Sequence, residues 1–279
     1  MFQVFLIGFI TILCLCMLYP FIHVLSISFS TSAEALRPGL HLYPREISLF
    51  AWDRVMTDKN IWLALGNTVF RTIVGTLLTL LIMSMGAYPL AKKYLPHRNF
   101  YMMFIVITMF FSGGLIPSYL LIKSLGLIDS RWALIVPGLI STYSLLILRN
   151  FFMGIPEELE DSAKIDGASD LRILFTLVIP LSKPVLATLG LWSAVGHWNA
   201  WFDALLYLQD QKLFVLQTFL RRLVITTEGD PLLPVSSVFE TAETVKAAVI
   251  MFTALPILIV YPFLQKYFVK GTLVGSLKG

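Results

Sequence analysis

The chain has 279 residues, of which 57% are hydrophobic and only 14% are charged, and its formal net charge is +4. A soluble domain of this size needs more polar surface than this composition supplies. The composition therefore favours a membrane protein, and the small positive charge suits a protein beside anionic lipid. The basic residues are too dispersed to indicate a nucleic-acid partner.

Six stretches contain no Asp, Glu, Lys or Arg and are long enough to cross a bilayer as helices, which takes about 17–25 residues. They cover residues 1–33, 72–91, 99–122, 132–148, 184–202 and 247–265. Because lipid offers no hydrogen-bonding partner to the backbone, each crossing is expected to be helical. We expect one all-α membrane domain over residues 1–279, with six transmembrane helices at about 5–29, 66–90, 100–122, 132–152, 184–206 and 246–268.

The segment between the first two expected spans, 34–61, contains Pro38 and Pro44 and is too polar to cross a membrane. Its second half begins the stretch "SLFAWDRVMTDKNIWLALGNTVF", which favours a short interfacial helix leading into span two. Arg71 lies at the outer start of that span, where a cation is expected to pair or to reach the membrane interface. A role for Arg71 in the translocation path is the alternative.

The third expected span is interrupted by Gly113, Gly114 and Pro117. Glycine and proline both weaken a helix interior, so a break or kink is expected there. Pro137 predicts a similar irregularity in the fourth span.

The longest inner loop, at about 154–183, carries "GIPEELEDSAKIDGASDLRILFTLVIPLSKP" between spans four and five. Pro156 fits the first turn of a helix, and four acidic residues then suit the positive N-terminal end of that helix. Asp166-Gly167 predicts the end of the helix, since glycine adopts the left-handed turn that follows a helix. Ser169 can cap a second helix, in which leucine and valine recur at helical spacing. The loop therefore predicts two short helices joined by a sharp turn, with a small, acidic face that suits a groove on another protein. An ordinary amphipathic connector is the alternative.

Near the outer half of span five, "GHWNAWFDALLYLQD" gathers Trp198, Asn199, Trp201 and Asp203. Aromatic faces, amides and carboxylates together are the groups that bind sugars, so these four residues are candidates for a substrate path. Asn199 and Asp203 are four residues apart and are expected to share one helix face. A belt of aromatic residues at the lipid interface is the alternative interpretation.

The sequence shows no catalytic or metal-binding constellation, because its four histidines and two cysteines lack the required spacing. It also lacks the G-x-x-x-x-G-K-[ST] pattern of an ATP-binding P-loop. The charge-free spans argue against an ion-coupled secondary transporter, which remains the alternative function. Basic residues are equally numerous in the candidate inner and outer segments, so their count does not decide the orientation.

The inner loop resembles the EAA loop of ABC-importer permeases, which reads E-A-A, three residues, G, nine residues and I-x-L-P. The matching residues, in motif order, are Asp161, Ser162, Ala163, Gly167, Leu177, Ile179 and Pro180. The exchanges of Asp for Glu, Ser for Ala and one aliphatic residue for another preserve charge or size. The surrounding "ELEDSAKIDGAS" is similar to the carbohydrate-uptake branch of that family.

The whole pattern looks like the smaller permease of the maltose-type importers, and this resemblance implies a type I ABC importer permease fold. Residues 111–138 and 261–279 resemble a subgroup that serves oligosaccharides released from complex polysaccharides. The chain would then be a non-catalytic subunit, with the loop docked on an ATPase. The residues expected to serve that docking are Glu160, Asp161, Ser162, Ala163, Asp166, Gly167, Leu177, Ile179 and Pro180.

The same resemblance implies the partners and the location. A second, homologous permease would complete a heterodimer in the bacterial cytoplasmic membrane, and two cytoplasmic ATPase subunits would use ATP and magnesium, so that this chain binds no cofactor. An extracytoplasmic solute-binding protein would deliver the sugar, with residues 226–237 as its contact. Because the loop would face the ATPases, both termini would be cytoplasmic.

Overall fold

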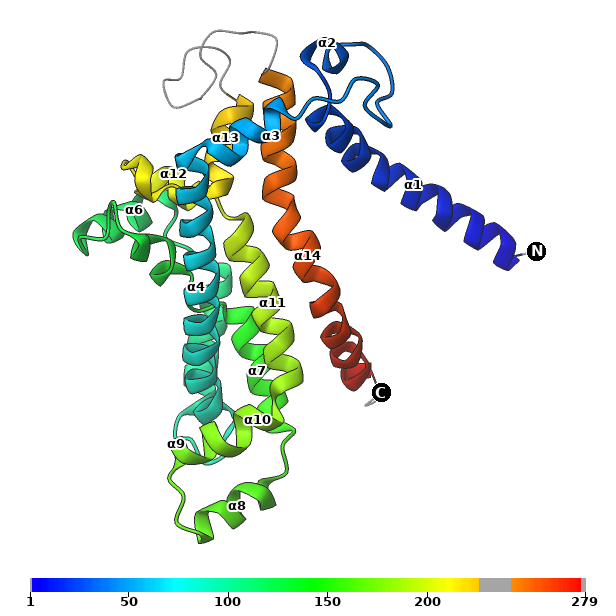
Figure 1. Cartoon of the computed structure of the whole chain (residues 1–279). Coiled ribbons are helices and arrows are strands. Elements are labelled where there is room, and N and C mark those ends of the chain that lie inside the picture. Colours follow the sequence, from blue (N-terminus) through cyan, green and yellow to red (C-terminus); the bar gives the residue numbers. More distant parts are fainter. Residues whose placement is uncertain (1, 226–241, 277–279) are drawn as a thin grey trace. The chain divides into compact units, whose positions relative to one another are not determined.

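The computed structural model describes residues 2–225 and 242–276 (Figure 1). The chain divides into two compact units, which are Met1–Leu65 with Val215–Leu258 and Gly66–Phe214 with Ile259–Gly279. Two of the three boundaries between the units fall inside long helices, α4 (Lys59–Ala91) and α14 (Ala242–Ser276), and the third lies just before α13 (Leu216–Ile225). The expectation of a single membrane domain over residues 1–279 stays a prediction.

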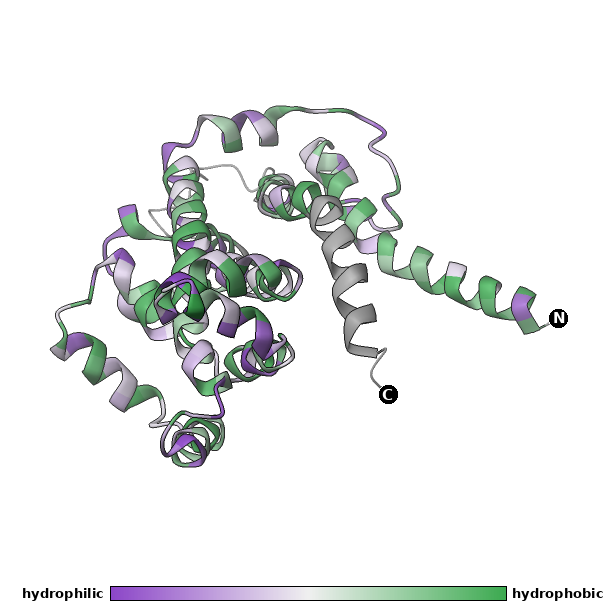
Figure 2. Cartoon of the chain, turned by 90° about the horizontal axis from the view of Figure 1, so that it is seen from below, coloured by the Kyte–Doolittle hydropathy of each residue, from purple (hydrophilic) through white to green (hydrophobic). Residues whose placement is uncertain are grey.

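The first unit begins with α1 (Phe2–Ser28), which carries large hydrophobic side chains on all of its faces. None of its most apolar 18-residue window is buried inside the chain. Figure 2 shows hydrophobic residues along most of its length. Such a helix needs lipid or another membrane helix around it.

Two short helices follow α1 in the same unit, α2 (Ser32–Ala35) and α3 (Phe50–Thr57). Trp52 of α3 stacks on Phe29, with ring centroids 5.4 Å apart. A single residue separates α3 from α4. The short helix expected before span two is therefore confirmed. The unit also contains α13 (Leu216–Ile225) and the first part of α14.

Three of the described helices, α1, α4 and α14, are long and apolar enough to cross a membrane on their own. Three further candidates are pairs of helices joined at a sharp bend. The count is therefore compatible with the six expected spans.

The first bent pair joins α5 (Arg98–Phe110) to α6 (Leu115–Ser124) at an angle of 114°. Gly114 lies at this bend with φ +83°, a conformation that a residue with a Cβ rarely adopts. The predicted break in span three is thus confirmed. The second pair, bent by 52°, joins the 3₁₀ segments η1 (Arg131–Leu134) and η2 (Val136–Gly138) to α7 (Thr142–Met153).

In the second unit, α4, α7 and α11 (Lys183–Asn199) run side by side (Figure 1). The helices of the 154–183 loop lie at one end of this bundle, and α6 and α12 (Phe202–Tyr207) lie at the other end. Glycines bring α4 and α11 close together, as is common in membranes, where packing rather than the hydrophobic effect associates helices. A Cβ at Gly75 of α4 would lie 2.6 Å from the His197 ring of α11, and one at Gly190 would lie 3.2 Å from Leu80.

Span five differs from the expected range of 184–206, because α11 ends at Asn199 and α12 is a separate helix. Ala200 is extended at this break, and its carbonyl accepts a hydrogen bond from the Arg71 guanidinium of α4. Asp203 also pairs with Arg71. The arginine therefore stabilises a break that the apolar pattern does not reveal, and the predicted shared helix face of Asn199 and Asp203 is wrong.

Candidate functional site

The loop at 154–183, called the docking loop below, begins with α8 (Glu157–Ile165). Asp166 caps the helix, and Gly167 follows with φ +78°. The Gly167 N–H donates to the Lys164 carbonyl at 2.9 Å, and the Ala168 N–H donates to the Ala163 carbonyl at 3.0 Å. This pair of bonds is a Schellman motif, which satisfies the last carbonyls of a helix. The expected helix end at Asp166-Gly167 is confirmed.

The second half of the docking loop is α9 (Asp170–Ile173), the π-helical η3 (Leu174–Val178) and α10 (Ile179–Leu181). The Ser169 side chain accepts a hydrogen bond from the Arg172 N–H, as expected of a helix cap. The wider π turn shifts the register of the helix. Ile173, Leu174 and Val178 are buried in one cluster with Leu148 of α7. The loop is therefore anchored in the core of the bundle.

Ion pairs hold the first half of the docking loop to the segment that follows α4. Glu160 of α8 is 5% exposed and forms an ion pair with Lys92, the residue directly after α4. The Tyr88 hydroxyl donates to the same carboxylate at 3.4 Å, and the Lys92 Nζ lies 4.4 Å from the centre of the Tyr88 ring. A buried carboxylate needs such partners, because leaving it unpaired costs several kcal/mol, on the order of 3–5.

Two weaker contacts join α8 to the same basic segment, residues 92–98. The Lys93 Nζ lies 2.8 Å from a Glu157 oxygen, and this hydrogen bond lowers the pKa of the exposed Glu157 carboxyl below its ordinary value. Lys164 lies over the Tyr94 ring at 5.0 Å. The segment after α4 thus holds α8 along its length.

The remaining surface of α8 points away from the chain. Asp161, Ser162 and Asp166 are exposed, and Ile165 is 87% exposed. On α9, Leu171 is 60% exposed. These side chains form an exposed strip of small, acidic and aliphatic groups on an element that is anchored to the bundle. Such a strip is typical of a surface that binds another protein.

The expected docking residues therefore divide into two groups. Glu160, Ala163, Leu177 and Ile179 are buried or half-buried against the bundle, whereas Asp161, Ser162, Asp166, Gly167 and Pro180 are exposed. The sequence did not identify Lys92, Lys93 and Tyr94 as residues that contact α8. The opposite charges of segment 92–98 and α8 could have indicated this contact.

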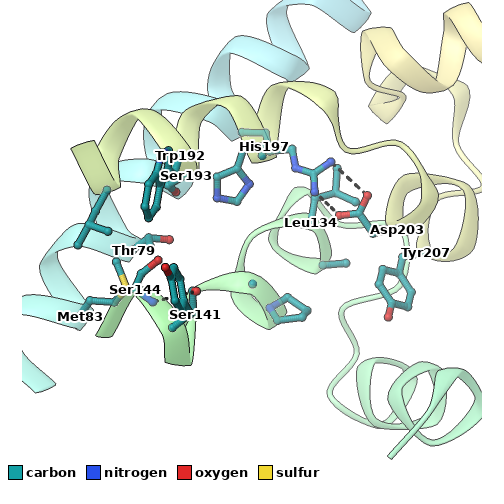
Figure 3. Close-up of a pocket in the computed structure, with 17 residues that line it drawn as sticks. Thr79, Met83, Leu134, Ser141, Ser144, Trp192, Ser193, His197, Asp203 and Tyr207 are labelled. Carbon is teal, nitrogen blue, oxygen red and sulfur yellow. Dashed lines mark hydrogen bonds and ion pairs between the residues drawn. The ribbon is translucent and has the colours of Figure 1, made fainter. Parts of the chain in front are cut away.

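A cavity of about 610 Å³ lies in the second unit, lined by residues of α4, η1, η2, α7, α11 and α12 (Figure 3). Figure 3 shows Trp192 and His197 of α11 facing Ser141 and Ser144 at the start of α7, with Asp203 and Tyr207 of α12 closing one side. The complete lining is Arg71, Thr79, Met83, Ala133, Leu134, Pro137, Gly138, Ser141, Tyr143, Ser144, Leu189, Trp192, Ser193, Gly196, His197, Asp203 and Tyr207.

Of the four predicted substrate-path residues, only Asp203 lines this cavity. Trp198 is buried elsewhere, Asn199 is exposed at the end of α11, and Trp201 packs edge-on against Phe202. Arg71, which the sequence placed at an interface, is 4% exposed and lines the cavity as the partner of Asp203. The segment 226–237, expected to contact a solute-binding protein, lies outside the described residues.

A family model described as "Binding-protein-dependent transport system inner membrane component" matches residues 61–274. The chain belongs to this family. It is a permease component of a binding-protein-dependent importer, as the resemblance of the docking loop implied, and it is a non-catalytic membrane subunit. The ion-coupled alternative gains no support.

Individual relatives agree with this membership. The permease is 43% identical to the polygalacturonan/rhamnogalacturonan transport system permease protein YtcP of Bacillus subtilis (strain 168), over 100% of this chain and 99% of that protein. It is 30% identical to the arabinooligosaccharides transport system permease protein AraQ of Halalkalibacterium halodurans, over 94% of this chain and 91% of AraQ.

A solved structure confirms the fold. The permease matches a chain in the crystal structure of a bacterial ABC transporter involved in the import of the acidic polysaccharide alginate. The TM-score is 0.88 at 33% sequence identity, and 96% of both chains is covered. The type I ABC importer permease fold expected from the docking loop is therefore correct.

Proposed function

We propose that this permease carries an oligosaccharide across the cytoplasmic membrane, driven by ATP that two cytoplasmic partner subunits hydrolyse with magnesium. A second, homologous permease completes the channel, and an extracytoplasmic solute-binding protein delivers the sugar. The support for a sugar is that relatives along the whole chain are named for polygalacturonan, rhamnogalacturonan and arabinooligosaccharides.

The observation that carries the proposal is the double anchoring of the docking loop. Its exposed strip, with Ser162 and Ile165, is free to meet an ATPase, while Glu160 is tied to the end of α4 and Ile173 is buried beside α7. A displacement of the loop must therefore move the inner ends of two spanning helices. In this proposal the residues Glu160, Leu177 and Ile179 transmit the movement, and the exposed residues make the contact.

Coupling requires that the docked loop takes different positions in the two states of the ATPase, because a partner shifts an equilibrium only by its difference in affinity for the two states. The short, capped α8 and the Gly167 turn suit this role, since they hold the strip in one shape while it moves. The loop then faces the cytoplasm, and both termini lie on the cytoplasmic side.

The experiment is uptake into sealed vesicles that contain the complete transporter, purified with its native partner subunits. We expect labelled arabino-oligosaccharide or oligogalacturonate to accumulate only with ATP inside and binding protein outside, and to be insensitive to a protonophore. Uptake driven by a proton or sodium gradient without ATP would contradict the proposal. So would a transporter that carries neither sugar under any of these conditions.

A further inference from the structure

We propose that the cavity of about 610 Å³ is a subsite for one glycosyl unit, with Trp192 as the platform for the sugar ring and Asp203 as an acceptor for its hydroxyl groups. This inference rests on the proposed function and deepens it, because it places sugar contacts in this chain in addition to any in the partner permease.

The position of Trp192 is the first reason. Trp192 lies nine residues after Lys183, so it is about 14 Å along α11 at a rise of about 1.5 Å per residue. This is the middle of the 17-residue helix, whereas tryptophans that anchor a helix in the headgroup region lie near its ends. Trp192 is 41% exposed and stacks on Tyr143, with the ring planes 20° apart. The stacked pair holds the indole fixed in the cavity wall.

The polar wall is the second reason. The Nε of Arg71 and the Oγ1 of Thr79 are buried and have no hydrogen-bonding partner among the described residues. Both side chains line the cavity, together with Ser141, Ser193 and His197. Those two atoms have almost no accessible surface, so the polar groups that a ligand in the cavity can reach come from Ser141, Ser193 and His197. Their hydroxyl and imidazole groups suit a hydroxyl-rich ligand.

The charge of the cavity decides how a sugar would bind. Arg71 uses both terminal nitrogens on Asp203 and donates to the Ala200 carbonyl as well. The two formal charges therefore cancel, and among the described lining residues no unpaired Lys or Arg is left for a sugar carboxylate. Asp203 is partly exposed and keeps acceptor capacity for hydroxyl groups. The subsite thus binds a ring face and hydroxyl groups, which neutral and acidic sugars share.

The test is uptake by the complete transporter in vesicles, with whichever labelled probe the unmodified complex transports, arabino-oligosaccharide or oligogalacturonate. We expect Trp192→Ala to lower uptake at least tenfold, and Trp192→Phe, which keeps a ring face, to retain at least a third. Trp132→Ala is the matched control, because Trp132 is 45% exposed but does not line the cavity. Its uptake should stay within twofold of the unmodified complex.

ATP hydrolysis stimulated by the binding protein is measured on the same vesicles, and it should stay within threefold in Trp192→Ala because the docking loop is untouched. Equal uptake by Trp192→Ala and Trp132→Ala would overturn the subsite. Equal losses in Trp192→Phe and Trp192→Ala would also overturn it, since they would indicate a packing defect. An unmodified complex that transports neither probe would instead refute the proposed function.

Discussion

At the scale of single residues, the pairing of Arg71 with Asp203 shows how a buried charge shapes a spanning helix. Arg71 is almost completely buried, and its two terminal nitrogens donate to Asp203 and to the carbonyl that α11 releases at Ala200. The sequence displays both residues, but their 132-residue separation hides their contact. The break after Asn199 could not be predicted for the same reason.

Removing one member of this pair should lower the stability of the permease complex. Asp203→Ala leaves the Arg71 charge buried and unpaired, which destabilises a protein by about 3–5 kcal/mol. We expect a clear fall in the thermal midpoint of the purified permease complex, measured by scanning fluorimetry. The double variant Arg71→Met, Asp203→Leu should recover most of the loss. A double variant as unstable as Asp203→Ala would show that the charge pair is not the cause.

The hydrogen bonds of Asp129 give a second prediction at the scale of residues, which concerns how the stability of the protein depends on pH. Its carboxylate accepts the backbone N–H groups of Gln209 and Asp210, and these bonds lower its pKa below the ordinary 3.8. Because the folded-state pKa is the lower one, the stabilisation is fully present above pH 3.8 and is lost as the pH falls through the folded-state pKa.

The comparison of the unmodified protein with Asp129→Asn tests this sign. The thermal midpoint of the unmodified protein should exceed that of the variant by a constant amount between pH 5 and 8, taken as roughly the range in which the carboxyl is fully ionised. The difference should shrink below pH 3.8. A difference that persists unchanged well below that pH would contradict the assignment.

At the scale of elements, the docking loop was the part of the fold that the sequence predicted best. Local rules fix its two halves, since the Gly167 turn and the Ser169 cap depend on neighbours within a few residues. The π turn of η3 and the burial of Ile173 depend on packing against α4 and α7. Such long-range contacts leave no periodic signal in the segment itself.

The anchor of α8 gives a prediction at this scale. Lys92→Met removes the partner of Glu160, so α8 should loosen from the end of α4 while the exposed strip remains. We expect the ATPase to co-purify, but the uptake of sugar per ATP hydrolysed to fall at least fivefold. Lys93→Met is the matched control, because Lys93 pairs with Glu157 at the exposed surface, where ion pairs contribute about 0–1 kcal/mol.

An unchanged ratio of sugar to ATP in Lys92→Met would contradict the coupling role of Glu160. Complete loss of the ATPase subunit from this variant would do so as well, because it would assign the pair to docking rather than to the transmission of movement.

At the scale of the whole molecule, composition and charge-free runs were enough to predict a helical membrane protein with six spans. The long helices α1, α4 and α14 follow from apolar length alone. The bends were only partly predictable, since Gly113-Gly114 marks the break of span three but nothing local marks Ala200. The sequence predicted the lining of the candidate cavity only in part, because that lining comes from α4, η1, η2, α7, α11 and α12.

The central claim is that the docking loop meets a cytoplasmic ATPase, and thiol cross-linking tests it most directly. Cys14 and Cys16, which are exposed, are first replaced by alanine. The probe Ser162→Cys then places a single thiol on the exposed strip of α8. Ser124→Cys lies at the opposite end of the same bundle and is the control. The prediction is that Ser162→Cys, once alkylated by a maleimide that carries a photoreactive group, cross-links to the ATPase subunit on illumination. Ser162→Cys should also resist a membrane-impermeant thiol reagent added to intact cells, whereas Ser124→Cys should do neither. An ATPase cross-link from Ser124→Cys, or labelling of Ser162→Cys from outside the cell, would contradict the account.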